Sequence, residues 1–538
     1  MGVYLNSKKP CSLYKTEVAG DYFVDKTEIL KELFPLVEQG GKYTCITRPR
    51  RFGKTVMASM IGAFLGKGMP CRELFKKLKI GDSSGFDKHI NKHDIIYIPF
   101  NEVPKGCDCY QQYIDRIQKR LIVDLQREYP QCNIDENAAL WDIMNDIYEL
   151  EDEIKFIFIF DEWDYIFHRD YVREEDKKAY VEFLSNLLKN QPYVAYAYMT
   201  GILPIAKYSS GSELNMFLEY TMASEEKYCE YFGFTEAEVD TLYEKYKRLT
   251  ENPAVTRDGL REWYDGYHTY SGERVYNPRS VVASLSNNNL GNYWTSAGPY
   301  DEIFYYIEKN VADVRDDLAL MVSGIPVLAK VKEYAATSMN LATKDEIFSA
   351  MVVYGFLSYE KGYVSIPNRE LLGKFIDMLQ KEASLGYVYR LAKASDEMLK
   401  ATLKGDTGTM REILEYAHDT EIPLLNYNNE TDLTAVVNLV YLSARDHYRI
   451  EREDKAGIGY VDFIFYPVKD RGADCIILEL KVDHTPDEAI KQIKERKYAL
   501  RFQGKLAENQ KYTGRILAVG IAYDRESKKH DCKIEVLK

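Results

Sequence analysis

The sequence contains no apolar run that approaches the roughly 20 residues of a membrane-spanning helix. Its first residues, 1–6, lack the apolar core of a signal peptide, and Asn6 stands where N-myristoylation requires serine or threonine. Low-complexity tracts and clear internal repeats are absent too. These absences favour a globular protein of the cytoplasm with no membrane partner.

Cysteine and histidine patterns that bind metal are also absent. The nine cysteines are scattered without a C-x-x-C pair, and the eight histidines are dispersed. No zinc-ligand spacing results. We therefore expect reduced thiols, as in a cytosolic protein.

An excess of positive charge is missing as well. The formal net charge of −13 at pH 7 excludes a surface that binds nucleic acid everywhere, so any such contact requires a local basic patch. The chain does have 538 residues, of which 46% are hydrophobic. This is enough for roughly three or four domains, each with its own core.

The most informative stretch runs from Thr47 to Thr55. Residues 43–47 are short, apolar and β-branched, which predicts a buried strand, and residues 56–65 are apolar at helical spacing. A strand, a loop, Gly-Lys-Thr and a helix are the context of a phosphate-binding loop. Lys54 would reach the β- and γ-phosphates of ATP, and Thr55 would hold Mg²⁺. The predicted nucleotide contacts of the loop are Arg51, Phe52, Gly53, Lys54 and Thr55.

This loop departs from G-x-x-x-x-G-K-[ST] at one position, since Arg48 stands where the pattern has glycine. That glycine normally makes the tight turn at the strand end. Because Gly-Lys-Thr alone is common, an ordinary strand–helix turn with a surface lysine is the alternative.

A second nucleotide-site signature lies at residues 155–162. Five apolar residues followed by Asp161 and Glu162 predict a strand buried on both faces, as in a parallel sheet. The carboxylates would stand at its carboxyl end, where open α/β sheets bind ligands. Asp161 would hold Mg²⁺, and Glu162 would orient and deprotonate the attacking water. A solvated strand end is the alternative.

Two further residues are weaker candidates. Thr200 ends the strand predicted over 193–199 and could sense the γ-phosphate, although a simple β-turn is the alternative. Arg279 opens a predicted helix and could approach phosphate, but a surface arginine at a helix start is the favoured interpretation.

The C-terminal part predicts another site. Glu479 and Lys481 lie two apart on a predicted strand, so both side chains leave the same face. Asp462 lies on the preceding strand, within hairpin reach. Two carboxylates suit Mg²⁺ or Mn²⁺, which would activate water toward a phosphodiester, with Lys481 positioning that water or neutralising charge. A cross-strand salt bridge is the alternative.

A basic stretch follows this site. Between residues 491 and 515, eight basic residues stand against two acidic ones. This is the best local candidate for contact with a phosphate backbone, although a solvated helix face explains it equally well. Gln492 could point back to the metal site.

With these motifs in view, residues 1 to about 210 resemble the AAA-ATPase-like domain of a largely uncharacterised bacterial family. The matching stretches are 22–27, 48–55, 161–164 and 200–202, and in that family the loop usually reads Arg-Pro-Arg-Arg-Phe-Gly-Lys. The resemblance implies that Arg48 is a family trait, while Trp163 replaces the usual tyrosine. Stretch 22–27 is an entry segment that could lie beside the nucleotide; a plain N-terminal helix is the alternative.

The C-terminal region is similar to the PD-(D/E)XK nuclease superfamily. Asp462 and Glu479-Leu480-Lys481 match its core, and Gln492 matches the glutamine often found in the following helix. A preceding helix usually adds an acid. Glu430 is the nearest candidate, but it lies before the helix expected over 434–445.

The expected fold is therefore α/β, in four parts. A P-loop domain with a parallel sheet spans 1–210, and a helical lid spans 211–320. A helical region spans 321–420 and includes a winged-helix-like hairpin whose turn is at 360–362. A restriction-endonuclease-like domain spans 421–538.

Three functions fit this expectation. The first is an ATP-dependent or ATP-regulated nuclease that uses Mg²⁺ and acts on DNA. The second is an ATP-bound switch whose C-terminal domain only grips nucleic acid. The third is a helper subunit whose partner supplies an arginine finger. A homo-oligomer is left open.

Overall fold

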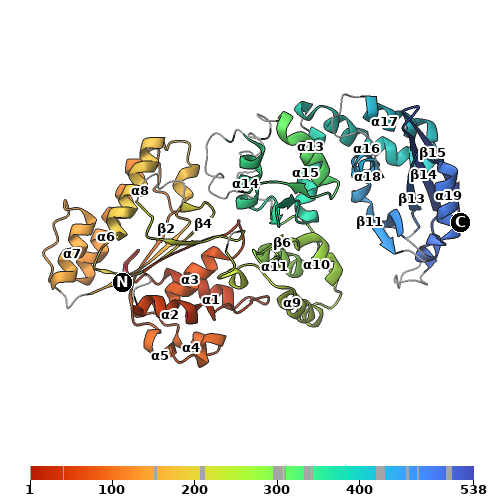
Figure 1. Ribbon diagram of the computed structural model, residues 1–538. Helices are drawn as coiled ribbons and strands as arrows, with labels where there is room; N and C mark the ends of the chain where they lie inside the picture. The colour runs from red at the N-terminus through yellow and green to blue at the C-terminus, as the bar shows by residue number, and fades with distance from the viewer. Residues whose placement is uncertain are drawn as a thin grey trace. The chain divides into compact units, whose positions relative to one another are not determined.

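The computed structural model describes residues 2–39, 42–150, 154–205, 213–223, 225–294, 307, 311–331, 341, 343–381, 383–419, 430–455, 460–468, 470, 472–503 and 512–537. The chain forms two compact units. Unit 1 comprises Met1–Ile303 and Leu328–Glu370, and unit 2 comprises Phe304–Val327 and Leu371–Lys538 (Figure 1). The predicted four-part division stays a prediction.

Unit 1 is built on a five-stranded sheet in which every neighbouring pair is parallel. The strand order is β2-β3-β4-β1-β5, so β4 separates the loop-bearing β1 from β3. The strands are β1 (Tyr43–Thr47), β2 (Asp94–Pro99), β3 (Phe156–Asp161), β4 (Val194–Gly201) and β5 (Leu218–Tyr220). The predicted α/β fold with a parallel sheet is confirmed.

Alternate residues of β3 enter two different cores, which is why this strand is apolar throughout. Ile157 and Ile159 belong to the core formed with the first helices, whereas the Phe160 ring meets Phe100 edge to face. Figure 1 shows helices on both sides of the sheet. They are α1 (Lys9–Val18), α2 (Ile29–Gln39) and α3 (Lys54–Leu65) on one side, and α6 (Tyr110–Glu128), α7 (Leu140–Leu150) and α8 (Glu174–Leu188) on the other.

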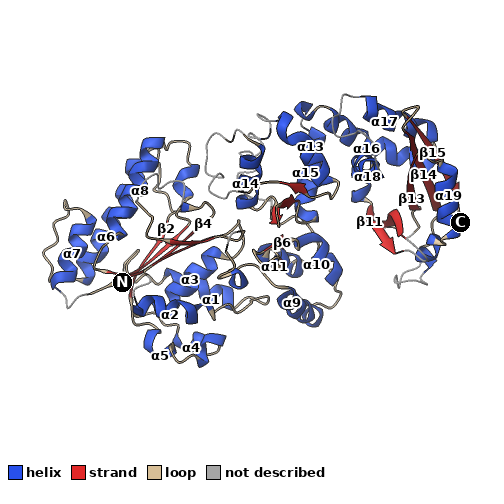
Figure 2. Cartoon of the chain, viewed as in Figure 1, coloured by secondary structure: helices blue, strands red, loops and turns tan. Residues whose placement is uncertain are grey.

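The rest of unit 1 is mostly helical, and several of its described helices start at threonine or asparagine caps, including Thr256, which accepts from the Gly259 N–H. Thr235 and Thr343 form capping boxes with Glu238 and Glu346, and Asn277 accepts from the Ser280 N–H. The elements are α4 (Arg72–Phe75), α5 (Phe86–His89), α9 (Glu236–Leu249), α10 (Arg257–Tyr264), β6 (Tyr267–His268), β7 (Arg274–Val275), α11 (Pro278–Ser286) and α14 (Lys344–Tyr354). The predicted hairpin is present as β9 (Ser358–Glu360) and β10 (Tyr363–Ser365) (Figure 2).

One expectation about the cysteines is wrong. Cys11 on α1 and Cys71 before α4 form a disulfide across a separation of 60 residues. No short spacing motif marks the pair, because the fold rather than the local sequence brings the two residues together. The other seven cysteines are free thiols, as expected.

Unit 2 contains a second five-stranded sheet of mixed direction, in the order β11-β12-β13-β14-β15. Only β13 and β14 run parallel within it, and α19 (Pro486–Glu495) forms the connection between them. Gly520 permits this helix to approach, since a Cβ at this position would lie 2.5 Å from the Pro486 carbonyl oxygen. The strands are β11 (Tyr448–Lys455), β12 (Tyr460–Pro467), β13 (Cys475–Val482), β14 (Ile516–Asp524) and β15 (Lys529–Val536).

The remaining helices of unit 2 correct one predicted boundary. They are α13 (Val311–Val322), α16 (Tyr387–Lys404), α17 (Thr407–Asp419) and α18 (Glu430–Val440), and α15 (Arg369–Lys381) begins at the end of unit 1. The helix expected over 434–445 in fact begins at Glu430. Among the described residues, no helix is long and apolar enough to cross a membrane.

Candidate functional site

The loop between β1 and α3 lines a cavity of about 680 Å³ in unit 1. This volume lies within the range of about 300–1,000 Å³ that is common for small-molecule sites. Arg51 and Gly53 both have left-handed backbone, with φ of 67° and 86°. The N-terminus of the twelve-residue α3 meets the cavity here, so its free N–H groups and dipole favour an anion. All five loop residues predicted to contact nucleotide line this cavity, together with Arg50.

The entry segment lines the same cavity. Tyr22, Phe23, Val24 and Lys26 all contribute to its wall. The entry segment thus lies beside the phosphate-loop cavity, and nucleotide binding in that cavity stays a prediction. Its aromatic and aliphatic side chains offer a less polar surface than the loop does, as the base of a nucleotide requires.

Lys54 is buried at the base of the loop, at 7% exposure. Its Nζ donates to the carbonyl oxygens of Arg48 at 2.9 Å and Pro49 at 2.8 Å. Burial lowers the pKa of its ammonium group to about 8, although Asp164, Glu162 and Asp161 favour the charged form. These contacts fix a basic side chain in the wall of the cavity.

Asp161 and Thr55 lie together although 106 positions separate them in the sequence. The Thr55 side chain hydrogen-bonds to the Asp161 carboxyl, which is only 1% exposed. Burial, reinforced by Glu162, raises the pKa of Asp161 to about 7. Asp161 Oδ1 is buried and has no hydrogen-bond partner among the described residues. An orphaned carboxylate oxygen beside a hydroxyl fits a Mg²⁺ ion bound directly or through water.

Glu162 lines the cavity beside Lys54. Its backbone is left-handed with φ of 54°, an unusual conformation for a residue with a side chain. Asn101, which follows β2, hydrogen-bonds to the Glu162 carboxyl, while burial raises the pKa of Glu162. A carboxyl held in this way has the basicity and the position to take a proton from water in the cavity.

The structure places Thr200 differently from the other candidates. Its hydroxyl donates to the Ile46 carbonyl oxygen at 2.8 Å, and the residue is fully buried between β4 and β1. Thr200 does not line the cavity, although it lies at the carboxyl end of β4. Its role as a phosphate sensor stays a prediction, while its hydroxyl fixes two strands here. Lys207, which follows shortly after Thr200 in the sequence and is a weaker candidate for the same role, lies outside the described residues.

Asp164 is a site residue to which the sequence analysis gave no role of its own. It lines the cavity, and its Oδ2 accepts from the N–H groups of Ile202 at 2.9 Å and Leu203 at 2.8 Å. Burial opposes its ionisation, yet hydrogen bonds from His168 and these N–H groups lower its pKa overall. Asp164 therefore fixes the turn after β4 beside this cavity. The only sequence signal was its place in Asp-Glu-Trp-Asp.

Arg279 lines the cavity from the first turn of α11. Burial and the nearby Arg279 lower the pKa of Arg51, so the two guanidinium groups are close enough to repel. Among the described residues, Arg279 has no ion pair. Its position in the cavity wall agrees with the prediction of an arginine near phosphate. Its side chain is also exposed, which agrees equally with a surface arginine at a helix start.

Arg48 explains how the loop forms without its first glycine. Its guanidinium donates to the carbonyl oxygens of Thr47 at 2.7 Å and Tyr220 at 2.9 Å, and lies 4.9 Å from the centre of the Phe232 ring.

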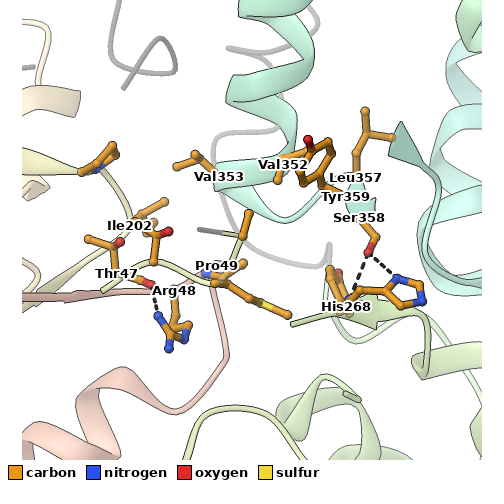
Figure 3. A pocket seen from close by; sticks show the side chains of 15 residues that line it. Thr47, Arg48, Pro49, Ile202, His268, Val352, Val353, Leu357, Ser358 and Tyr359 are labelled. Carbon is orange, nitrogen blue, oxygen red and sulfur yellow. Dashed lines mark hydrogen bonds between the residues drawn. The ribbon is translucent and has the colours of Figure 1, made fainter. Parts of the chain in front are cut away.

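Figure 3 shows Arg48 and Pro49 at a second pocket. At about 30 Å³, this pocket has room for roughly one water molecule. Pro49 there lies against Gly355, where an added Cβ would come within 2.7 Å.

Unit 2 brings the predicted nuclease residues together. The β12–β13 register pairs Phe463 with Leu478, so Asp462 and Glu479 occupy the next facing positions. Asp462 Oδ2 accepts from the Leu480 N–H at 2.7 Å. Lys481 Nζ donates to Glu479 Oε1 at 3.1 Å, confirming that the two side chains share a face.

Glu479 has the chemistry of a metal ligand. It is 3% exposed, and burial together with Asp462 raises its pKa to about 7. Gln492 from α19 donates to Oε1, whereas Oε2 is buried without a hydrogen-bond partner among the described residues. The orphaned oxygen beside a second carboxylate fits Mg²⁺ or Mn²⁺. The described residues contain no group of three acidic, histidine or cysteine ligands, and the Glu430 side chain lies outside them.

Comparisons with known proteins identify the families of the two regions that contain these residues. Residues 14–210 match the family model described as "Predicted AAA-ATPase", of AAA-ATPase-like domains, and residues 428–531 match that of the PD-(D/E)XK nuclease superfamily. The chain joins an AAA-ATPase-like domain to a PD-(D/E)XK nuclease superfamily domain. The predicted resemblance is confirmed for both domains.

One curated relative of this two-domain chain is the "Uncharacterized protein in vnfD 5'region" of Azotobacter chroococcum mcd 1. It is 27% identical over 283 residues, which cover 52% of this chain and 51% of the relative. The chain thus spans about half the length of that relative.

Two solved structures are similar at low levels. The Walker-type ATPase PABY2304 of Pyrococcus abyssi is 13% identical with a TM-score of 0.36, over 64% of this chain and 94% of that one. A signal-transduction ATPase with numerous domains, PH0952 of Pyrococcus horikoshii, is 11% identical with a TM-score of 0.24. The match covers 77% of this chain and 50% of that one.

Proposed function

We propose that the chain is an ATP-binding, ATP-regulated nuclease that cleaves DNA with Mg²⁺ or Mn²⁺. The observation that carries the proposal is that each unit buries a carboxylate oxygen without a partner beside a lysine or hydroxyl suited to phosphate chemistry. These oxygens belong to Asp161 in unit 1 and Glu479 in unit 2. A cytoplasmic setting would supply ATP and Mg²⁺ to both.

In unit 1, Lys54 and the N-terminus of α3 bind the phosphates, while Thr55 and Asp161 would hold Mg²⁺. The ion would neutralise charge on the β- and γ-phosphates. Glu162 holds an attacking water and accepts its proton, with Asn101 orienting the carboxyl. Arg279 would add positive charge near the phosphates.

In unit 2, Asp462 and Glu479 would hold the metal, which would polarise a phosphodiester and a bound water. Lys481 donates a hydrogen bond to Glu479 and supplies positive charge where negative charge develops. Gln492 fixes Glu479 Oε1, so the orientation of this carboxylate does not depend on the metal.

A series of hydrogen bonds from the phosphate loop to Glu370 supports regulation by ATP. Arg51 donates to the Tyr293 carbonyl oxygen. The N–H groups of Tyr293, at 2.5 Å, and Trp294, at 2.6 Å, donate to Glu370 Oε1. Glu370 is the second residue of α15, the helix through which the chain continues into the residues of unit 2. A change at the phosphate loop would therefore shift the start of α15.

The ATP-bound switch is the second candidate. It is favoured by Thr200, whose hydroxyl is engaged with Ile46 rather than directed to the cavity. A switch would bind ATP tightly and release phosphate no faster than background. Phosphate release that is well above background and lost in Glu162→Gln would contradict it.

The test of the nuclease is cleavage of linear, circular and single-stranded DNA with Mg²⁺ or Mn²⁺. We expect cleavage by the wild type and by Lys491→Ala, a matched exposed lysine of unit 2, but none by Lys481→Ala. Equal cleavage by Lys481→Ala, or none by the wild type with either metal, would contradict the nuclease.

A further inference from the structure

In the described part of the basic stretch 491–515, three basic side chains form ion pairs with acidic ones. Lys491 lies 3.7 Å from Glu495, and Lys494 pairs with Glu535. Arg515 pairs with Asp474 at 2.6 Å. Three of the basic residues predicted to meet a phosphate backbone thus already have acidic partners.

Arg496 differs from these residues. It ends α19 and is half-buried, and within the described part of unit 2 it has no carboxylate at ion-pair distance. Its Nη1 lies 3.5 Å from the hydroxyl oxygen of Tyr498, a fully buried residue. A half-buried guanidinium without an acid has lost water and gained only one weak contact.

Tyr498 connects Arg496 to the carboxylates. The Tyr498 hydroxyl also hydrogen-bonds to the Gln492 side chain, which donates to Glu479 Oε1. The guanidinium thus lies at the end of a short series of contacts that begins at Glu479. Neighbouring Lys497 is exposed and has no such connection among the described residues.

We propose that Arg496 binds a backbone phosphate of the nucleic acid next to the phosphodiester that the metal at Asp462 and Glu479 would polarise. The planar guanidinium fork matches two oxygens of a phosphate. This proposal rests on the proposed nuclease function and names a residue that binds the nucleic-acid substrate of that nuclease. Tyr498 keeps the fork in place, and the phosphate supplies the missing negative charge.

The test uses the full chain with a fluorescent DNA duplex of about 30 base pairs, with Ca²⁺ in place of Mg²⁺ to prevent cleavage. The dissociation constant is measured at several salt concentrations for the wild type and Arg496→Gln. The matched controls are Lys491→Gln and Arg515→Gln, whose charges are paired. Arg496→Lys keeps the charge but not the fork.

We expect Arg496→Gln to weaken binding by about tenfold at moderate salt and to reduce the log–log salt slope by about one. Arg496→Lys should restore the slope, and the two controls should change binding less than about twofold. A slope unchanged in Arg496→Gln, while the wild type binds DNA, would overturn the role of Arg496 and leave the nuclease proposal intact. Absence of both binding and cleavage in the wild type would overturn both.

A purely structural role for Arg496 makes a different prediction. If Arg496 only supported Tyr498, then Tyr498→Phe would weaken binding as much as Arg496→Gln does. We expect Tyr498→Phe to keep the wild-type salt slope, because the guanidinium remains. An equal loss of slope in the two variants would contradict phosphate binding.

Discussion

Lys54 Nζ donates to the Pro49 carbonyl oxygen at 2.8 Å, so the lysine of the phosphate loop is tied to the loop's own backbone. With the second bond to Arg48, two of its three donors are used within the loop. This arrangement keeps the ammonium group at the cavity and leaves one donor for a ligand.

Replacing Lys54 should weaken nucleotide binding. Lys54→Met removes a buried cation, and a hydrogen bond to a charged group contributes about 1.5–3 kcal/mol, so ATP affinity should fall about 10- to 150-fold. Titration with a fluorescent ATP analogue measures this. The exposed Lys67→Met is the control, and an affinity that is equal in both variants would exclude Lys54 from the site.

Metal binding in unit 2 should depend on pH. The pKa of Glu479 is raised from its ordinary 4.5 to about 7, so below about pH 7 the metal must displace a proton. The half-saturating Mg²⁺ concentration for cleavage should therefore rise as pH falls, approaching about tenfold per unit for one displaced proton, and level off above about pH 7.

The raised pKa of Glu479 should also change the stability of the metal-free chain with pH. The folded chain holds the Glu479 proton more tightly than the unfolded chain, so stability should fall as pH rises from about 4.5 to 7. Glu479→Gln, which cannot ionise, should melt at a higher temperature than the wild type at pH 8, with a smaller difference at pH 5. Equal differences at both values would contradict a raised pKa.

The disulfide should reduce the number of titratable thiols and stabilise the folded chain. Without reductant the unfolded chain should show seven titratable thiols, and with reductant all nine. Cys11→Ala/Cys71→Ala should lower the free energy of unfolding by about 2–4 kcal/mol, because the bridge closes a loop of 60 residues in the unfolded chain. Cys109→Ser is the control, and nine thiols without reductant would rule out the bridge.

Glu370 should carry the effect of ATP on cleavage. In Glu370→Gln, one carboxylate oxygen becomes an NH₂ donor, so either the N–H groups of residues 293 and 294 or the Ser280 hydroxyl lose their acceptor. We expect ATP binding within about threefold of wild type, unchanged basal cleavage, and at least half of the ATP response lost.

Cleavage assays with and without ATP measure this change in Glu370→Gln. Glu262→Gln, which removes the exposed pair with Arg369, should keep the full response. A full ATP response in Glu370→Gln would exclude this route.

The sequence predicted those parts of the fold in which local pattern and burial agree. Residues 43–47 are β-branched or largely apolar and residues 156–160 are wholly apolar because their strands are buried in the sheet, so the loop and the carboxylates could be placed at strand ends. Glu479 and Lys481 could be paired because side chains two apart on a strand always share a face.

The rest depends on distant parts of the chain. Strands β5, β11 and β15 were missed, since short or polar edge strands carry little periodic signal. The resemblance marked Arg48 as a family trait but could not show its partners, because Tyr220 and Phe232 lie far along the chain. The contacts of Glu370 and the bridge between Cys11 and Cys71 likewise join residues that no local motif connects.

The most direct test of control by ATP is the rate of DNA cleavage with Mg²⁺, with and without ATP, by wild type and Lys54→Met. We predict a several-fold change with ATP in the wild type and the same basal rate in Lys54→Met under both conditions. An ATP response of equal size in Lys54→Met, or no response in the wild type, would contradict control of the nuclease by this nucleotide site.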